Sequence, residues 1–150
     1  MQTLPEIVAD RTQRARLVTD TVQLIDAEVQ RKGGLTGMAL KTGYAVVSRL
    51  QGGKMIERAV NMLLPEFAVA IEPLHASFRA SGSHGPFRDF LAQRPAEATN
   101  ALLAITDEKA RQTDNSVLKK TYEKLRPTAV KHVQEALPGL GDLVDRHTRG

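Results

Sequence analysis

Glu72 and His75 are the first residues in this sequence whose types and spacing could do chemistry. Three residues apart on a helix, a carboxylate and an imidazole lie on one face, and ferritin-like bundles use this Glu-x-x-His step to bind a metal. A complete site needs a second copy and bridging glutamates, whereas the chain offers only the reversed pair His132 and Glu135. The alternative is that His75 borders the core stripe and that Glu72 caps a helix or is solvated. An enzyme or metal-binding protein based on this pair is therefore the third hypothesis.

His84 and a Gly-Gly-Lys sequence at 52–54 are two further candidates. His84 lies in the Ser/Gly-rich segment 81–85, where it could act as an acid or base near neutral pH, but no partner is evident. The Gly-Gly-Lys sequence resembles part of a phosphate-binding loop, yet the full motif requires glycine in place of Ser48 and Ser or Thr in place of Met55. The end of one helix and the start of another is the simpler interpretation. We assign no catalytic, cofactor-binding or metal-ligating residue.

A basic surface in the C-terminal third is the best supported of the weak sites, and its candidate residues are Lys120, Lys124, Arg126 and Lys131. The three lysines fall on one face of a helical wheel, where they could contact the phosphates of a nucleic acid or another anion. Glu135 lies on the same face, and no aromatic residue is placed there to stack on bases. A solvated face without a partner is the other interpretation. A nucleic-acid-associated protein is thus the second hypothesis.

The elements that must position these residues are predicted to be helical. A chain of 150 residues has the size of one domain, so we expect a single domain over residues 1–150. Its apolar fraction is 41%, but aromatic residues make up only 4%, which suits packed helices better than a β-sandwich. No run of alternating polar and apolar residues indicates a strand. We therefore predict an all-α bundle of about seven to nine short helices, several interrupted by proline.

Capping residues, glycines and prolines divide the chain into these helices. Thr3 and Glu6 have the spacing of a capping box, and Asp10 with Gln13 starts the next helix. We expect later helices to open at Met55, Pro65, Pro86, Pro95 and after the capping cluster 113–116, with a last short helix over 140–146. Pro73 should kink or interrupt its helix, and Pro127 should separate two helices. The central helix should carry a core stripe of four residues at helical spacing, Phe67, Ile71, Leu74 and Phe78.

The segment 35–50 reads as a helix but contains Gly37 and Gly43, each of which costs about 1 kcal/mol relative to alanine. Close approach of a neighbouring helix would compensate for these glycines, and a bend or a mobile segment is the alternative. The segment could also bind a partner or lie on a membrane. Since Lys41 and Arg49 give it only a thin cationic face, partner binding is the favoured form of this idea.

Five stretches together resemble a family of uncharacterised small helical proteins from bacteria, notably actinobacteria. They are Leu24–Val29, Gly33–Gly37, Leu63–Phe67, Arg79–Gly82 and Tyr122–Pro127. The resemblance runs over nearly the whole chain and implies one compact bacterial domain. It implies no activity, so no functional residue is transferred from it.

Charge and composition exclude several classes of protein. The chain has no cysteine, which excludes disulfides, thiolate catalysis and Cys-based metal sites and fits a cytoplasmic location. It has no signal-like N-terminus and no stretch near the ~20 apolar residues that span a bilayer. The net charge of +4 is small, and acidic residues are interspersed among the basic ones. The leading hypothesis is a non-enzymatic cytoplasmic protein, without a cofactor, that acts through association with another protein or with itself.

Overall fold

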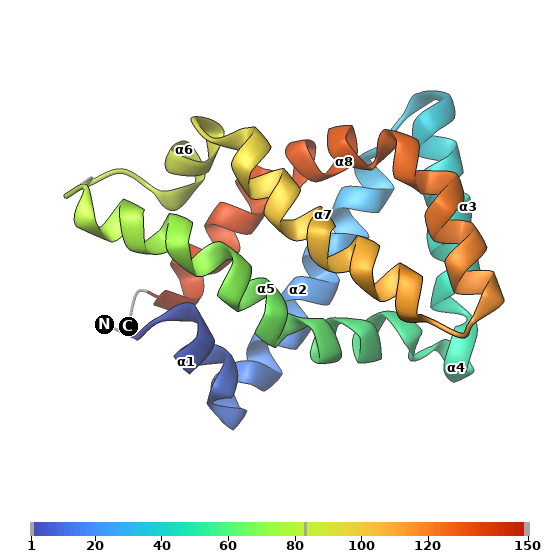
Figure 1. Ribbon diagram of the computed structural model, residues 1–150, viewed down its shortest axis with the longest axis horizontal. Helices are drawn as coiled ribbons and strands as arrows, with labels where there is room; N and C mark the ends of the chain where they lie inside the picture. Colours follow the sequence, from blue (N-terminus) through green and yellow to red (C-terminus); the bar gives the residue numbers. More distant parts are fainter. Residues whose placement is uncertain (1, 83, 149–150) are drawn as a thin grey trace.

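The computed structural model describes residues 2–82 and 84–148, and every regular element in these ranges is an α-helix (Figure 1). The predicted all-α fold class is therefore confirmed, with a number of helices inside the expected range. No helix within the described ranges is both long and apolar enough to cross a bilayer. The helices are α1 (Leu4–Ala9), α2 (Arg11–Arg31), α3 (Gly34–Ser48), α4 (Leu50–Gly53), α5 (Met55–Ala80), α6 (Phe87–Ala92), α7 (Pro95–Gln112) and α8 (Ser116–Thr148).

Side-chain caps begin the first two helices where the sequence predicts them. The Glu6 N–H donates to Thr3 Oγ1 at 3.3 Å at the start of α1, and the Gln13 N–H donates to Asp10 Oδ1 at 3.0 Å at the start of α2. Asn115 accepts in the same way from the Leu118 N–H at 3.0 Å, which caps α8. Each bond satisfies a backbone donor that has no partner within its own helix.

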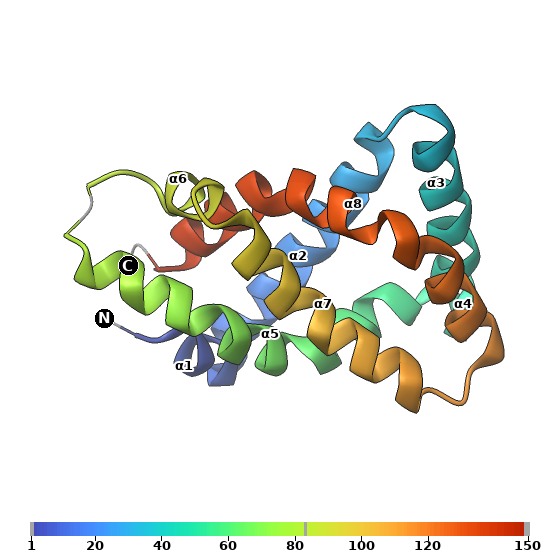
Figure 2. The same cartoon turned by 45° about the horizontal axis from the view of Figure 1, so that its top comes forward.

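The helix start predicted at Pro65 and the break predicted at Pro127 are wrong, and of the kink or interruption expected at Pro73 the interruption is wrong, because α5 and α8 continue through all three prolines and through Pro138. All four prolines are exposed. On the solvent face a proline removes one helical hydrogen bond and bends the helix, but its ring meets no packed neighbour. Figure 2 shows the result in α8, which curves around the rest of the molecule instead of ending. The separate helix expected over 140–146 is the last part of α8.

A contact from α2 compensates for the missing hydrogen bond at Pro65. Proline has no N–H, so the carbonyl of Asn61, four residues earlier, has no helical donor. Arg14 donates to this carbonyl through Nη2 and to Asn61 Oδ1 through Nε, the second bond measuring 2.9 Å. The bend in α5 is thus held by a side chain from another helix.

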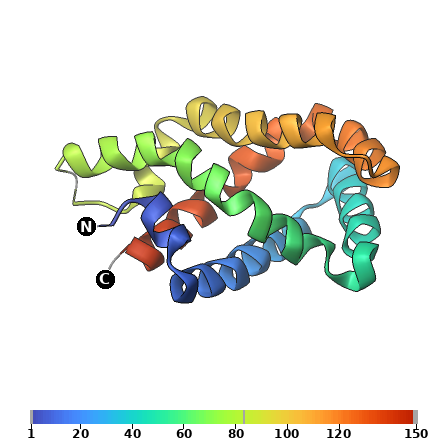
Figure 3. The ribbon, with the colours of Figure 1, turned by 60° about the horizontal axis from the view of Figure 1, so that its bottom comes forward.

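Helix α3 stands at one end of the molecule, beside the first half of α8 (Figures 1 and 3). The two helices run antiparallel, since Lys32, just before α3, contacts Glu135 while Gly43 packs on Leu125. A Cβ on Gly43 would lie 2.9 Å from Leu125 Cδ1, and one on Gly37 would lie 2.8 Å from the Lys32 carbonyl carbon. Close approach of the neighbouring helix α8 therefore explains Gly43, whereas Gly37 is needed where the chain at Lys32 turns into α3. After α3, positive φ values at Gln51, Gly52 and Gly53 turn the chain into α5.

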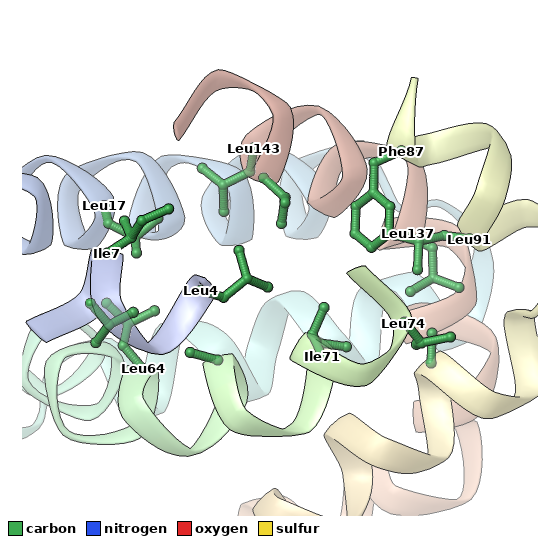
Figure 4. Packing of buried hydrophobic residues seen from close by; sticks show 14 of the residues in the cluster. Leu4, Ile7, Leu17, Leu64, Ile71, Leu74, Phe87, Leu91, Leu137 and Leu143 are labelled. Atoms are coloured by element: carbon green, nitrogen blue, oxygen red, sulfur yellow. The ribbon is translucent and has the colours of Figure 1, made fainter. Parts of the chain in front are cut away.

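The main hydrophobic core lies between α1, α2, α5, α6, α7 and α8, and Figure 4 shows many of its residues facing one another. The predicted central stripe on α5 contributes to it: Ile71 and Leu74 are each 3% exposed, while Phe67 and Phe78 are half-buried. The most deeply buried aromatic residue is Phe87 on α6, at 0% exposed. The core thus joins the elements that surround the site.

Candidate functional site

An apolar pocket of about 430 Å³ lies between α1, α2, α5, α7 and α8, with one residue, Leu40, contributed by α3. Most of its lining is aliphatic, and the polar lining residues are Thr21, Glu28, Lys32, Thr106, His132 and His147. The volume is within the 300–1,000 Å³ that is usual for small-molecule sites, which combine an apolar wall with a few polar groups. The pocket is therefore the strongest candidate for a binding site.

The pocket is elongated along α2. Leu17 and Lys32 both line it, and fifteen residues of helix separate them, which corresponds to roughly 20 Å. An ion pair marks each end of this length. His147 Nε2 lies 2.7 Å from Asp20 Oδ2 near one end, and Lys32 Nζ donates to Glu135 Oε1 at 3.2 Å at the other. The shape suits an extended chain better than a compact ring system.

Lys32 is 7% exposed, and its charge is balanced within the protein. Its Nζ lies 3.2 Å from Glu135 Oε1 and 3.6 Å from Glu28 Oε2. Glu28 also accepts from Arg31. A buried ammonium is tolerated when carboxylates surround it in this way, because each charge compensates the desolvation of the other.

Two polar groups on the pocket wall have no hydrogen-bond partner among the described residues: the hydroxyl of Thr21 and both ring nitrogens of His132. His132 is 9% exposed, and its Nδ1 lies 3.7 Å from Glu135 Oε1, which is too long for a hydrogen bond. Burial, and then the charge of Lys32, lower the pKa of His132, so the ring is neutral at pH 7. It offers one N–H donor and one nitrogen acceptor to the pocket.

Thr106 and His147 complete the polar lining, and both are engaged by the protein. The Thr106 hydroxyl lies 2.7 Å from the Tyr122 hydroxyl, and His147 pairs with Asp20. Thr21 and His132 are therefore the groups on which a bound molecule could make hydrogen bonds. An unsatisfied buried polar group costs about 1–3 kcal/mol, which a ligand would recover.

Glu72 and His75 do lie together, as their spacing predicts, but they face Arg79 and not the pocket. Arg79 Nη2 donates to Glu72 Oε1 at 2.9 Å, and Nη1 donates to His75 Nδ1. Glu72 Oε2 also accepts from the Leu4 N–H at 3.2 Å. A guanidinium thus occupies the space between the carboxylate and the imidazole. Across residues 2–82 and 84–148, no three His, Cys, Asp or Glu side chains gather to hold a metal ion.

His75 is part of the core. It is 2% exposed, and its ring meets the edge of Phe87 at 5.0 Å between centroids. Burial, and then the charge of Arg79, lower its pKa, so it packs as a neutral ring. His84 is exposed in the loop between α5 and α6, in which Ser83 lies outside the described residues. The structure thus gives both residues a tertiary role: Glu72 anchors α1 to α5 through the Leu4 N–H, and His75 packs α5 against Phe87 of α6.

The predicted basic residues of α8 fall into two groups. Arg126 turns toward α7, where its Nε and Nη2 donate to the two carboxylate oxygens of Asp107 at 2.8 and 3.1 Å. Lys120, Lys124 and Lys131 are exposed. Arg126 therefore has a structural partner, whereas anion contact by the three lysines stays a prediction.

Sequence reasoning missed Lys32 and Thr21 as site residues, and it considered His132 only as a metal ligand paired with Glu135. Lys32 stands before two glycines, which resembles an ordinary helix end, and His132 falls in a charged stretch of α8. The sequence did carry a signal that His132 faces the interior: Ala136 and Leu137, four and five residues later, are apolar and lie on the same side of a helix.

A hollow of about 380 Å³ beside Arg16 and Asp20 is lined by α2 alone, and we assign it no function.

Comparison with known proteins gives a family but no activity. Residues 4–148 match Family of unknown function (DUF6918). Neither the curated proteins nor the solved structures yield a match. The matched range includes every helix described above and the whole pocket. The chain therefore belongs to DUF6918, a family of unknown function.

Proposed function

We propose that this protein binds an extended apolar molecule that carries one uncharged hydrogen-bonding group, such as a long-chain alcohol or ketone. The observation that carries the proposal is the apolar pocket of about 430 Å³ with the unpartnered His132 in its wall. An apolar chain would fill the part between the helices, and its polar group would meet the imidazole or the Thr21 hydroxyl. No bond is made or broken in this function.

The charge balance of the pocket favours an uncharged ligand over a fatty acid. Lys32 already faces Glu28 and Glu135, and His132 is neutral. A ligand carboxylate would bring a negative charge into an apolar space without a free cation to balance it. A hydroxyl or carbonyl needs only a hydrogen bond, which the imidazole supplies as a donor or as an acceptor.

Filling the pocket should abolish binding while leaving the fold intact. Ala136 is half-buried in the pocket wall, so Ala136→Phe places a ring where the ligand chain would lie. We expect this variant to lose at least about tenfold in affinity for dodecan-1-ol, measured by displacement of a fluorescent apolar dye. The thermal midpoint should be unchanged or higher, since the ring buries apolar surface.

Ala104→Phe is the matched control, because Ala104 is exposed on α7 and does not line the pocket. This variant should bind dodecan-1-ol as the original protein does. If dodecan-1-ol does not displace the dye from the original protein, the pocket is not a ligand site and the proposal is wrong. The same holds if the Ala136→Phe and Ala104→Phe variants bind dodecan-1-ol equally well.

The identity of the polar group is tested with three ligands of equal chain length: dodecan-1-ol, dodecanoate and dodecane. We expect dodecan-1-ol to bind about fivefold more tightly than dodecane, since one net hydrogen bond contributes about 1 kcal/mol. His132→Leu should remove this preference and leave dodecane binding unchanged. Tighter binding of dodecanoate than of the alcohol would contradict the uncharged ligand and would point to Lys32.

We further propose that the protein is a single non-enzymatic domain that works in the cytoplasm of a bacterium. The main core cluster, which draws on α1, α2, α5, α6, α7 and α8, supports one domain. The absence of cysteine supports a reducing compartment, and the family resemblance of the sequence supports a bacterial source. Association with another protein or a second copy stays a prediction.

A further inference from the structure

Helix α3 presents apolar residues on two opposite sides. Leu40 points inward and lines the pocket. Leu35 and Met38, on the other side, are 86% and 64% exposed, and Val46 is 38% exposed. Only Gly37 of this helix is buried. Isolated exposed apolar residues are common on proteins, but three on one side of one helix form a stripe that calls for an explanation.

The lysines of α8 point to the same side of the molecule as this stripe. Thr121 and Leu125 of α8 pack on Gly43 of α3, while Tyr122 turns toward Asp107 of α7. Successive helical residues rotate by about 100°, which places Lys120, Lys124 and Lys131 about 60–100° from Thr121 in the direction away from Tyr122. The lysines therefore lie on the side of α8 that faces away from α7.

Since α3 and α8 run antiparallel, the stripe and the lysines share one outer surface. On α3, Leu40 is rotated toward the pocket by about 60° from Gly43, whereas Leu35 and Val46 are rotated by about 60–80° the other way. The pocket and α7 thus lie on the inner side of the pair. We define the α3–α8 outer face by six residues, Leu35, Met38, Val46, Lys120, Lys124 and Lys131.

The charge around this face is positive over a long stretch of sequence. Between Glu28 and Glu57 the chain has five basic residues and no acidic one. Arg31 and Lys32 pair with Glu28, and Lys54 pairs with Glu57, so the excess positive charge of this stretch comes from Lys41 and Arg49. Two acidic residues of α8 lie on or near this side: Glu135 is engaged by Lys32, and Glu123 is exposed beside Lys124. Exposed apolar side chains surrounded by cations match the boundary of a bilayer that contains anionic lipid.

We propose that the α3–α8 outer face docks on anionic phospholipid membranes. A second copy of the chain fits this face poorly, because a symmetric contact would bring the lysines together. A nucleic acid would use the lysines but not Leu35 and Met38, and the face has no aromatic residue for base stacking. The choice of a bilayer rests partly on the proposed function, because a protein that binds an apolar ligand would take it from a lipid phase and return it there. Helix α3 lies between this face and the pocket, so a bilayer docked on the face would be one helix away from the ligand.

Sedimentation with vesicles tests the proposal. We expect the protein to bind vesicles of phosphatidylcholine with phosphatidylglycerol, to bind pure phosphatidylcholine much more weakly, and to be released as salt rises. Changing Lys120, Lys124 and Lys131 to Gln should weaken binding by about fivefold per lysine, or roughly a hundredfold together. Met38→Gln should weaken it by about tenfold.

Met62→Gln is the matched control, because Met62 is 60% exposed on α5, outside the proposed face. This variant should bind vesicles as the original protein does. Equal loss in Met38→Gln and Met62→Gln would overturn the proposal, as would failure to bind anionic vesicles. Tighter binding to duplex DNA than to vesicles, or a dimer that Met38→Gln dissociates, would also overturn it in favour of another occupant.

Dye displacement in solution distinguishes this proposal from the proposed function. If dodecan-1-ol still displaces the dye but vesicles do not bind, the docking face is wrong and the pocket stands. If the protein binds vesicles but dodecan-1-ol does not displace the dye, the proposed function is wrong, and the docking face is still supported by its exposed apolar side chains and its lysines. Helicity measured by circular dichroism should be the same for the lysine, Met38 and Met62 variants, since each of these side chains is exposed.

Discussion

Phe87→Ala should lower the free energy of unfolding by about 3–5 kcal/mol, which is a large part of the stability of a protein of this size. Phe87 is 0% exposed and packs on Phe78 at 5.2 Å and on His75 at 5.0 Å between ring centroids. Its N–H donates to Asp145 Oδ2 of α8 at 3.1 Å. Removal of the ring leaves a cavity at the junction of α5, α6 and α8.

Urea unfolding followed by circular dichroism measures this loss. Phe90→Ala is the control, since Phe90 makes the same kind of contacts from the same helix but is half-buried. We expect its loss to be smaller by at least about 1 kcal/mol, because less apolar surface returns to water. If Phe87→Ala does not fold, Phe87→Leu should fold with a loss of about 1–3 kcal/mol. Equal losses at the two positions would contradict the described packing.

Gly141→Ala is the second change for which we expect a large effect. A Cβ at this position would lie 2.5 Å from Arg88 Cα and 2.6 Å from the Arg88 backbone nitrogen. These atoms belong to the backbone of α6, so α6 as a whole must move away from α8. Although alanine favours a helix by about 1 kcal/mol over glycine, we expect a net loss of about 1–3 kcal/mol.

Gly139→Ala provides the comparison two residues away on the same helix. There the added Cβ would meet Leu24 Cδ1 at 2.5 Å, which is the end of a flexible side chain. Leu24 can rotate, so this variant should be close to neutral in the same urea experiment. A result in which Gly139→Ala loses more stability than Gly141→Ala would show that α6 and α8 do not approach as described.

Local signals in the sequence predicted much of the helical pattern. Thr3, Asp10 and Asn115 act through hydrogen bonds to residues only three positions away, so their effect is readable from spacing alone. The stripe through Ile71 and Leu74 follows from helical periodicity in the same way. Such features need no knowledge of which helices become neighbours.

The prolines show where local reasoning fails. Whether Pro65 ends a helix or only bends it depends on what its ring and the freed Asn61 carbonyl meet. The answer comes from Arg14, which lies more than forty residues away in the sequence. Pro127 and Pro138 face solvent on α8, and this also becomes visible only once the core is assembled.

The candidate site was not predictable, because it is made by contacts between distant segments. Lys32 lies between α2 and α3, His132 lies on α8, and a hundred residues separate them in the sequence, so their approach depends on how these helices pack. The membrane interpretation of 35–50 lacked support for the same reason, since Lys41 and Arg49 were the only cations on that segment. The lysines of α8 join the surface in three dimensions.

The shallow burial of α3 sets how quickly a bound molecule could leave. The other walls of the pocket belong to the core, and α5 alone has seven buried residues, whereas α3 has only Gly37. Local opening follows the weakest contacts, so α3 can move aside at a free-energy cost well below that of global unfolding. Release should therefore be fastest where α3, which contributes Leu40 to the pocket wall, is itself drawn toward a surrounding phase. The most weakly held wall of the pocket would then also determine where its contents are delivered.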